Sequence, residues 1–276
     1  AVLFVFGPIS GIVSSVPIFA SADASAAYVM ELEDLLAKSD GSAEEQNVRA
    51  AVEPLRSFRE IELRGIVFSY KDHGKHDFTV GPINVTLKAG ETVFISGGNG
   101  SGKSTLLRLL SALYWPQAGT ILVDGTPVTH DNVAAYRGLF SSVFSDYHLF
   151  KRLYGIEPLA MAEAPALLTT LDVADKTGLA GDAFATIDLS AGQRKRLALI
   201  VAMLEQRPMC ILDEWAADQD PVFRRKFYAE LIGVLKARGI TVIAVSHDDR
   251  YYDRGDRRLH MEEGQIVSDK RERVNA

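Results

Sequence analysis

A glycine-rich loop between a strand-like run and a helix-like run is the feature that most constrains how this chain folds. Residues 97–105 read GGNGSGKST and fit the pattern G-x-x-x-x-G-K-[ST]. A run with strand character, 91–96, precedes the loop, and the leucine-rich run 106–110 follows it. In such a unit the glycines let backbone N–H groups turn toward phosphate oxygens, and the start of the helix adds positive charge. The segment therefore predicts an α/β fold that binds a nucleoside triphosphate.

Every residue of this loop is a candidate contact for the nucleotide. The lysine of such a loop reaches the β- and γ-phosphates, and the hydroxyl that follows it ligates Mg²⁺. We expect these roles for Lys103 and Ser104. The candidate nucleotide ligands are Gly97, Gly98, Asn99, Gly100, Ser101, Gly102, Lys103, Ser104 and Thr105.

The beginning of the chain is apolar enough to be part of a membrane span. Residues 1–20 carry no charged side chain, and a helix of about 20 apolar residues crosses a bilayer. No basic stretch precedes this run, which argues against a secretory signal. We expect the end of a transmembrane domain at 1–57, with its last span at about 1–20 and a cytoplasmic helical linker after it. A nucleotide-binding domain is expected at 58–276. The alternative for 1–20 is a buried core helix.

Charge and cysteine content narrow the class of protein. The formal net charge is −6, which argues against a protein that binds nucleic acid through an overall basic field. The local basic patch at 194–196 does not change that. Cys210 is the only cysteine, so an intramolecular disulfide is excluded, and a reducing compartment fits.

Hydrophobic patterning places the remaining elements. The stretch from about 152 to 205 has largely helical character. The apolar runs 209–212 and 240–245 are short, continuous and bounded by polar residues, as in buried parallel strands. Short runs rich in β-forming residues predict further strands at 61–70, 78–87, 91–96 and 119–123.

Two acidic residues directly follow the apolar run 209–212. In an open α/β sheet a buried strand delivers such carboxylates to its C-terminal end, beside the phosphate-binding loop. Asp213 is the candidate Mg²⁺ ligand, because Mg²⁺ prefers one or two carboxylates together with phosphate oxygens. Glu214 is then placed to polarise an attacking water. The alternative is a strand that simply ends in solvent, and the pairing with the loop at 97–105 favours the site.

A third motif, Leu-Ser-Ala-Gly-Gln at 189–193, resembles the LSGGQ signature of ATP-binding-cassette (ABC) proteins, with alanine for the first glycine. By itself the motif also fits an ordinary helix start capped by a serine. Its position between the loop at 97–105 and the acidic pair follows the order of the ABC family. The resemblance implies that Ser190, Ala191, Gly192 and Gln193 contact the ATP of a partner subunit.

The ABC resemblance assigns further residues. Tyr70 matches the aromatic residue that stacks on adenine, the alternative being a core aromatic of a strand. Asp220 occupies the D-loop position, and His247 matches the switch histidine that contacts the γ-phosphate. The implied catalytic residues are therefore Glu214, His247 and Lys103. The implied fold is a P-loop cassette with a mixed sheet core, an antiparallel β subdomain and a helical subdomain.

One element departs from the family pattern. Ser145 stands at the Q-loop position, where the family carries glutamine. Serine is shorter and would reach Mg²⁺ or the attacking water only through another water. Asp146 is a candidate to compensate. The departure puts the usual coupling chemistry in doubt but leaves Mg²⁺ binding by Ser104 and Asp213 intact.

Several segments resemble one subfamily, the bacterial half-transporters that export cyclic peptides and pyoverdine-type siderophores. The resemblance implies a homodimer of cassettes that binds ATP and Mg²⁺ head to tail, on the cytoplasmic side of the bacterial inner membrane. The membrane partner is expected through fused spans, and the cargo is a peptide or siderophore named only by analogy. The segments that carry the resemblance are 140–150, 192–198, 213–221 and 246–252.

Three other functions compete with this hypothesis. A soluble ABC ATPase acting on DNA or ribosomes would have a basic surface or long coiled-coil insertions, and the sequence has neither. The ATPase subunit of an importer would dock on a separate membrane chain and would not need the apolar run 1–20. A non-enzymatic sensor fits the serine at position 145 but not the retention of Glu214 and His247.

Overall fold

The computed structural model describes residues 21–23, 25–30, 33, 53–70 and 78–271. The chain divides into two compact units, Ala1–Val52 and Glu53–Ala276. The described residues of the first unit are helical. None of the helices in the described part of the chain has both the length and the apolar character that crossing a bilayer requires. The predicted span at about 1–20 lies outside the described residues.

A six-stranded sheet forms the centre of the second unit. Its strands are parallel except for one antiparallel edge strand. The predicted buried parallel strands at 209–212 and 240–245 are therefore confirmed. In spatial order the strands are β12 (Gln265–Arg271), β11 (Arg257–Glu262), β3 (Thr92–Gly97), β10 (Thr241–Val245), β9 (Met209–Asp213) and β6 (Phe140–Val143).

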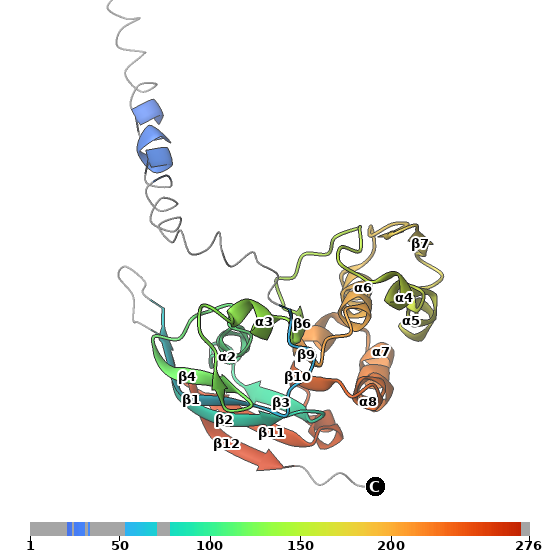
Figure 1. Ribbon diagram of the computed structural model, residues 1–276. Helices are drawn as coiled ribbons and strands as arrows, with labels where there is room; N and C mark the ends of the chain where they lie inside the picture. The colour runs from blue at the N-terminus through green and yellow to red at the C-terminus, as the bar shows by residue number, and fades with distance from the viewer. Residues whose placement is uncertain (1–20, 24, 31–32, 34–52, 71–77, 272–276) are drawn as a thin grey trace, which may run out of the picture. The chain divides into compact units, whose positions relative to one another are not determined.

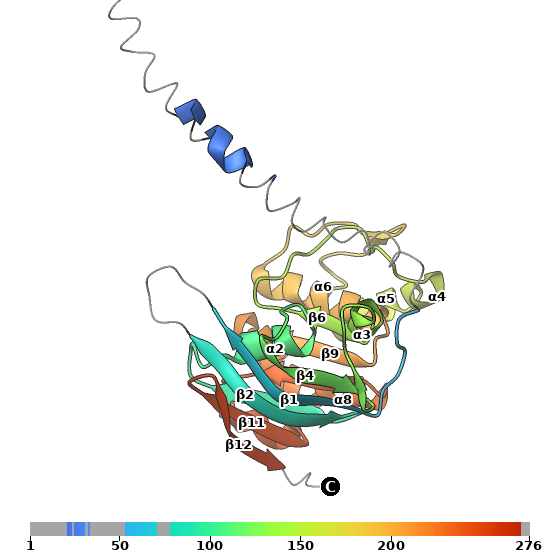
Figure 2. The ribbon, with the colours of Figure 1, turned by 60° about the vertical axis from the view of Figure 1, so that its left-hand side comes forward.

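A four-stranded antiparallel sheet makes up the predicted β subdomain. Its turn at Asp124 is tied to the start of β1, because the Asp124 carboxylate accepts the backbone N–H groups of Arg59 and Glu60 at 2.8 and 2.9 Å. Figure 2 shows β1, β2 and β4 side by side. In spatial order the strands are β2 (Thr79–Lys88), β1 (Glu60–Ser69), β4 (Ala118–Val123) and β5 (Thr126–Pro127).

The prediction of a largely helical stretch from 152 to 205 is correct only within 158–170 and 191–204. Between them, residues 172–190 are loops and a small hairpin, β7 (Leu179–Ala180) and β8 (Ala183–Phe184). Gly181 forms the turn of this hairpin at a φ of 66°, which side chains with a Cβ rarely adopt. The helices of the stretch are α4 (Pro158–Met161), α5 (Ala164–Thr170) and α6 (Ala191–Leu204).

The remaining helices connect the strands. One continuous helical segment consists of α7 and α8 joined through a wider π-helical turn, η2, and two short 3₁₀ helices follow β9 and β10. They are α2 (Lys103–Leu110), α3 (Val133–Arg137), η1 (Trp215–Asp218), α7 (Pro221–Lys226), η2 (Phe227–Leu231), α8 (Ile232–Ala237) and η3 (Asp249–Arg254).

Both faces of the central sheet are covered, which explains why β9 and β10 are apolar throughout. Val242 and Ala244 of β10 pack into a cluster with α5, α6, α7 and α8. Ile243 and Val245 point to the opposite face and pack with α2 and the antiparallel sheet. In Figure 1, β3, β9 and β10 lie between β1, β2 and β4 on one side and α4, α5 and α6 on the other.

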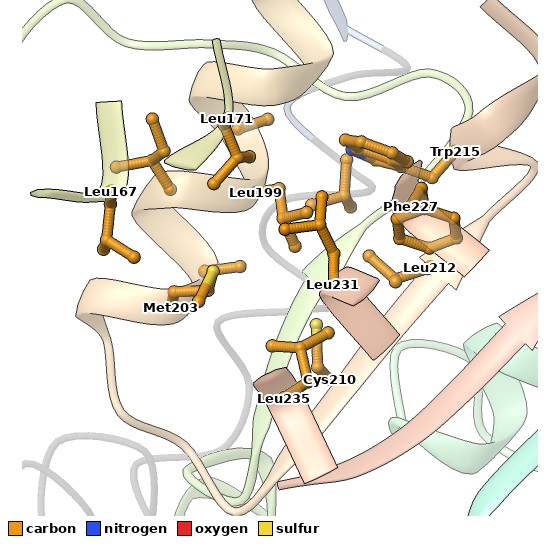
Figure 3. Close-up of a cluster of buried hydrophobic side chains, with 14 of the residues drawn as sticks. Leu167, Leu171, Leu199, Met203, Cys210, Leu212, Trp215, Phe227, Leu231 and Leu235 are labelled. Atoms are coloured by element: carbon orange, nitrogen blue, oxygen red, sulfur yellow. The ribbon is translucent and has the colours of Figure 1, made fainter. Parts of the chain in front are cut away.

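The helical side of the core is large and built from facing side chains of the sheet and the helices. Figure 3 shows these side chains directed toward one another from α6, β9 and the segment α7–η2–α8. They hold α6 against the strand that ends in the acidic pair. The labelled members are Leu167, Leu171, Leu199, Met203, Cys210, Leu212, Trp215, Phe227, Leu231 and Leu235.

Candidate functional site

The order of the parallel strands brings the predicted motifs to one edge of the sheet. β3 runs into the loop 97–105, and β9 ends at Asp213. β10 lies between these two strands and leads into Ser246 and His247. Because parallel strands all point the same way, their C-terminal ends form a shared crevice where ligands bind.

The loop is shaped by glycines that no other residue could replace without strain. Gly97 has a φ of 144°, and a Cβ there would lie 2.2 Å from the Met261 carbonyl oxygen. Gly102 has a φ of 97°, and its Cβ would lie 2.9 Å from a methyl of Val80. The loop therefore packs directly against β11 and β2.

Lys103 is held inside the loop by the loop's own backbone. Its ammonium donates to the carbonyl oxygens of Gly97 at 3.0 Å and Gly98 at 2.8 Å. Burial lowers the pKa of Lys103, and the negative charges of Glu214 and Asp213 oppose that shift. The Ser101 hydroxyl is buried and lacks a hydrogen-bond partner among the residues that the structure describes. The loop thus offers a positioned cation and an unused hydroxyl.

Tyr70 lies beside this loop. Its hydroxyl and that of Thr105 share a hydrogen bond of 3.1 Å. The ring meets Phe68 and Tyr114 edge-on at centroid distances of 5.1 and 6.0 Å. The side chain is 36% exposed, so Tyr70 is neither a buried core aromatic nor a free surface residue.

Asp213 is the most deeply buried carboxylate of the site, with 1% of the residue exposed. Its Oδ2 accepts the Ser145 hydroxyl at 3.3 Å, and its Oδ1 finds no hydrogen-bond partner in the described part of the chain. A buried carboxylate oxygen without a partner is costly, and a hydrated Mg²⁺ would satisfy it. The residues present therefore fit this ion. Asp146, the candidate to compensate for the missing glutamine, instead pairs with Arg108 at 2.9 Å.

Glu214 and His247 contact each other directly. His247 Nε2 and Glu214 Oε1 are 3.0 Å apart, although β10 and β9 deliver these residues separately. Glu214 has a φ of 50° and a ψ of 32°, a left-handed conformation that costs roughly 1–2 kcal/mol for a residue other than glycine. Such strain persists only where the surroundings hold it, and it concentrates at functional sites.

The segment around His247 is anchored through Ser246. The Tyr228 and Ser246 hydroxyls are 2.6 Å apart, and the Tyr252 hydroxyl donates to the Ser246 carbonyl at 2.9 Å. Tyr228 belongs to the π-helical turn η2, a kind of turn that is frequent at functional sites. Glu214, His247, Ser246 and Tyr228 are among the residues that line a hollow of about 380 Å³.

The signature segment 190–193 forms the start of α6. Ser190 caps this helix: its hydroxyl accepts the Gln193 N–H at 3.3 Å, and the Gln193 side chain accepts the Ser190 N–H at 3.1 Å. The capping interpretation is thus confirmed, and it is compatible with phosphate binding. The backbone N–H groups of Ala191 and Gly192, at the first two positions of the helix, have no acceptor within the helix.

The D-loop packs directly on the signature segment. Asp220 caps α7 by accepting the Phe223 N–H at 2.9 Å, and these backbone bonds together with Arg196 lower its pKa. The Gln219 amide donates to the Gly192 carbonyl at 3.1 Å and accepts the Arg196 Nε at 2.9 Å. Gln219 therefore links the segment 190–193 to the segment 217–221 through side-chain hydrogen bonds.

The basic run 194–196 is not the surface patch that its composition suggests. Lys195 and Arg196 are buried, with 4% and 9% of each residue exposed. The Lys195 ammonium donates to the Glu214 carbonyl at 3.1 Å and to the Asp218 carboxylate at 2.7 Å. Sequence reasoning missed this contact. The available signal was that the run continues straight into the all-apolar helical stretch 197–204.

Comparison with known proteins agrees with this geometry. Residues 80–217 match the family model described as ABC transporter, which is half of the chain. The chain belongs to the ABC transporter family, and it is an ATPase cassette that binds ATP.

Three curated relatives are similar over most of this chain. ATP-binding protein SyrD of Pseudomonas syringae pv. syringae is 42% identical over 276 residues, 98% of this chain and 49% of that protein. The ATP-dependent lipid A-core flippase of Burkholderia orbicola (strain AU 1054) is 34% identical, over 78% of this chain and 38% of that protein. The probable syringafactin export ATP-binding/permease protein SyfD of Pseudomonas syringae pv. syringae (strain B728a) is 30% identical, over 76% of this chain and 34% of that protein. The chain spans half of these relatives or less.

Solved structures share the fold. A bacterial Atm1-family ABC exporter with ATP bound matches with a TM-score of 0.68 and 23% identity, over 80% of this chain and 41% of that one. The cassette MJ0796, in a dimeric post-hydrolysis state with ADP and Pi, matches with a TM-score of 0.65 and 24% identity, over 77% of this chain and 99% of that one.

Proposed function

We propose that this chain is the ATP-hydrolysing motor of a bacterial ABC half-transporter that exports a peptide. The observation that carries the proposal is the contact between Glu214 and His247, beside the loop that holds Lys103 and the buried Asp213. A carboxylate held by an imidazole next to a phosphate-binding loop is what hydrolysis of a phosphoanhydride needs. Positioning and charge neutralisation supply most of the acceleration in phosphoryl transfer.

Each predicted site residue receives a role in this proposal. Lys103 and the N–H groups of 97–105 bind the β- and γ-phosphates, and Tyr70 stacks on adenine. Ser104 and Asp213 hold Mg²⁺, which neutralises phosphate charge when bound. Glu214 orients the attacking water and accepts its proton. His247 holds Glu214 through the 3.0 Å contact and reaches the γ-phosphate.

A second cassette completes the site in this proposal. Residues 190–193 bind the ATP held by the partner's loop, and the D-loop with Asp220 lies next to them. The N–H groups of Ala191 and Gly192, which have no acceptor within α6, support this role, because a helix N-terminus is a ready anion site. The dimeric state of the MJ0796 cassette adds support from a protein of the same fold. We infer a homodimer in which both sites are composite.

The membrane part and the cargo are proposed from relatives and from the start of the chain. The chain covers about half of SyrD and less of the flippase and of SyfD, and SyfD is named for syringafactin export and as a permease. The apolar run 1–20 fits the last span of a fused domain. We propose a cassette on the cytoplasmic face of the inner membrane and a cyclic or siderophore-type peptide as cargo. The alternative is the ATPase of another ABC system without a fused membrane domain.

Two substitutions separate binding from hydrolysis. Glu214→Gln should leave ATP affinity unchanged and lower hydrolysis about 10²-fold or more, the range for loss of a general base. Lys103→Ala should weaken ATP binding itself. Glu230→Gln, at an exposed position of η2, is the matched control. Hydrolysis by Glu214→Gln at the wild-type rate would contradict the assignment, and unchanged ATP affinity of Lys103→Ala would contradict the role of the loop.

The cargo is tested in the producing cell. A strain with Glu214→Gln in its chromosomal copy should retain a peptide product that the parent strain secretes. Mass spectrometry of culture medium and cell extract measures this. Identical secreted peptides in the two strains would refute peptide export and leave the ATPase assignment standing.

A further inference from the structure

Lys195 joins the signature helix to the backbone of the proposed catalytic glutamate. It lies in the second turn of α6, after the cap at Ser190. Its buried ammonium reaches across to the Glu214 carbonyl at 3.1 Å and to the Asp218 carboxylate at 2.7 Å. One cation thus contacts both the residue that follows β9 and the start of the D-loop.

The link is reciprocal. The indole N–H of Trp215 donates to the Lys195 carbonyl at 2.9 Å, while the Lys195 ammonium donates to the Glu214 carbonyl. The adjacent residues 214 and 215 are therefore both hydrogen-bonded to the same lysine. Trp215 is 1% exposed, and its ring lies 4.5 Å from that of Phe227. Because the Trp215 ring and the Lys195 ammonium are both buried, the second turn of α6 and residues 214–215 have little room to move independently of each other.

Because the Lys195 ammonium is buried, these hydrogen bonds are sensitive to a displacement of α6. A buried charge is costly unless it is paired and hydrogen-bonded, and Lys195 has its charge partner in Asp218 and a backbone partner in Glu214. If α6 shifts, the ammonium either loses these partners or carries the 214 backbone with it. The second outcome avoids an unpaired buried charge. Movement of α6 is therefore passed to Glu214.

Glu214 is the residue for which such a movement has a consequence. Its left-handed backbone directs the side chain to His247, and the Lys195 bond is made to the carbonyl of that same strained residue. Displacement of a reacting group by about 1 Å can change a rate about 10²-fold. A small rotation at residue 214 would therefore alter hydrolysis without altering the ATP-binding loop.

We propose that Lys195 is a positioning residue that couples the two ATP sites of the cassette dimer. This inference rests on the proposed function, in which 190–193 contact one ATP while Glu214 acts on the other. When a γ-phosphate docks on the start of α6, the helix takes up its bound position, and Lys195 sets the backbone of Glu214 in the second site. Occupation of one site thereby prepares the base of the other.

The test compares hydrolysis curves of the full chain and its Lys195→Met variant over a range of ATP concentrations. Methionine keeps an unbranched apolar stem, one atom shorter than that of lysine, and lacks the ammonium. We expect cooperative hydrolysis by the wild type. For the variant we expect a turnover number about 10-fold lower and a Hill coefficient near 1, with ATP affinity within about twofold. Lys226→Met, which removes a surface ion pair to Asp172, is the matched control and should change neither quantity.

The outcomes separate this inference from the function on which it rests. A wild-type chain that neither binds nor hydrolyses ATP would refute the proposed function. Hydrolysis by the wild type with the same Hill coefficient and turnover in Lys195→Met would refute the coupling alone, as would a wild-type Hill coefficient of 1. If Lys195→Met does not fold, Trp215→Phe removes the indole bond to Lys195 and leaves a smaller aromatic ring packed against Phe227. It should lower turnover and cooperativity in the same direction, and unchanged values would overturn the proposal.

Discussion

The contact between Gly192 and the D-loop allows a sharp prediction for Gly192→Ala. A Cβ at this position would lie 2.7 Å from the Asp218 carbonyl oxygen, closer than the 3.0 Å below which real Cβ contacts essentially never occur. The obstacle is backbone, not the end of a flexible side chain. The start of α6 and residues 218–219 must therefore move apart by several tenths of an ångström.

The cost follows from two opposing effects. Overpacking of this kind destabilises by about 1–3 kcal/mol, while the higher helix propensity of alanine offsets up to about 1 kcal/mol. We expect a net loss of about 1–2 kcal/mol, which lowers Tm by roughly 2–8 °C for a domain of this size. The turnover number should fall as well, because the Gln219 bond to the Gly192 carbonyl and the Arg196 bond to Gln219 both stretch. A shift toward 1 Å at the site predicts turnover at least about 10-fold lower.

Thermal unfolding and ATP hydrolysis of Gly192→Ala measure the two quantities. Ala166→Gly is the control, because this alanine of α5 is exposed and lies outside the proposed ATP contacts. The control should retain turnover within about threefold and lose at most about 1 kcal/mol. Wild-type Tm and turnover for Gly192→Ala would show that the two segments are not in the close contact from which the prediction is built.

Three further predictions concern ionisable groups. Arg257 contacts both carboxylate oxygens of Asp269 and lowers its pKa, so this stabilisation is present above about pH 4 and is lost as pH falls through the lowered pKa. Asp269→Asn should cost at most about 1 kcal/mol in urea unfolding at pH 7, because the carboxylate is half-exposed, and the cost should shrink as the pH is lowered. Burial raises the pKa of Cys210 to about 12, so a thiol reagent at pH 8 should react only after denaturant is added. Asp213→Asn should abolish the Mg²⁺ dependence of ATP affinity, measured by titration with and without the ion.

The parts of the site that sequence could predict are those carried by local patterns. The loop at 97–105 is contiguous in sequence. The spacing of its glycines by itself indicates the backbone conformations that the loop adopts. The strands β9 and β10 are buried on both faces, so their apolar runs stand out. Asp213 and Glu214 follow one of these runs directly. Local signals of this kind need no knowledge of the rest of the fold.

Features that depend on tertiary partners could not be predicted. Lys195 and Arg196 belong to a basic run, yet they are buried because partners from the distant segment 214–220 satisfy their charges. β11 was not predicted as a strand, since its buried Arg257 is stabilised by distant partners: Asp269 on β12, Glu91 and the Thr86 carbonyl oxygen. The contact between Glu214 and His247 likewise arises from the strand order.

The place of β10 in the sheet makes the site a late product of translation. In the described sheet β10 separates β3, which leads into the loop 97–105, from β9, which carries Asp213. Residues of β10 are the last of the three strands to leave the ribosome, and pairing over such long sequence separations is slow. Before β10 leaves the ribosome, the nascent chain contains β3 and β9, but the strand that pairs with both and aligns them is missing. We therefore expect ATP to stabilise the complete site only after β10 has left the ribosome.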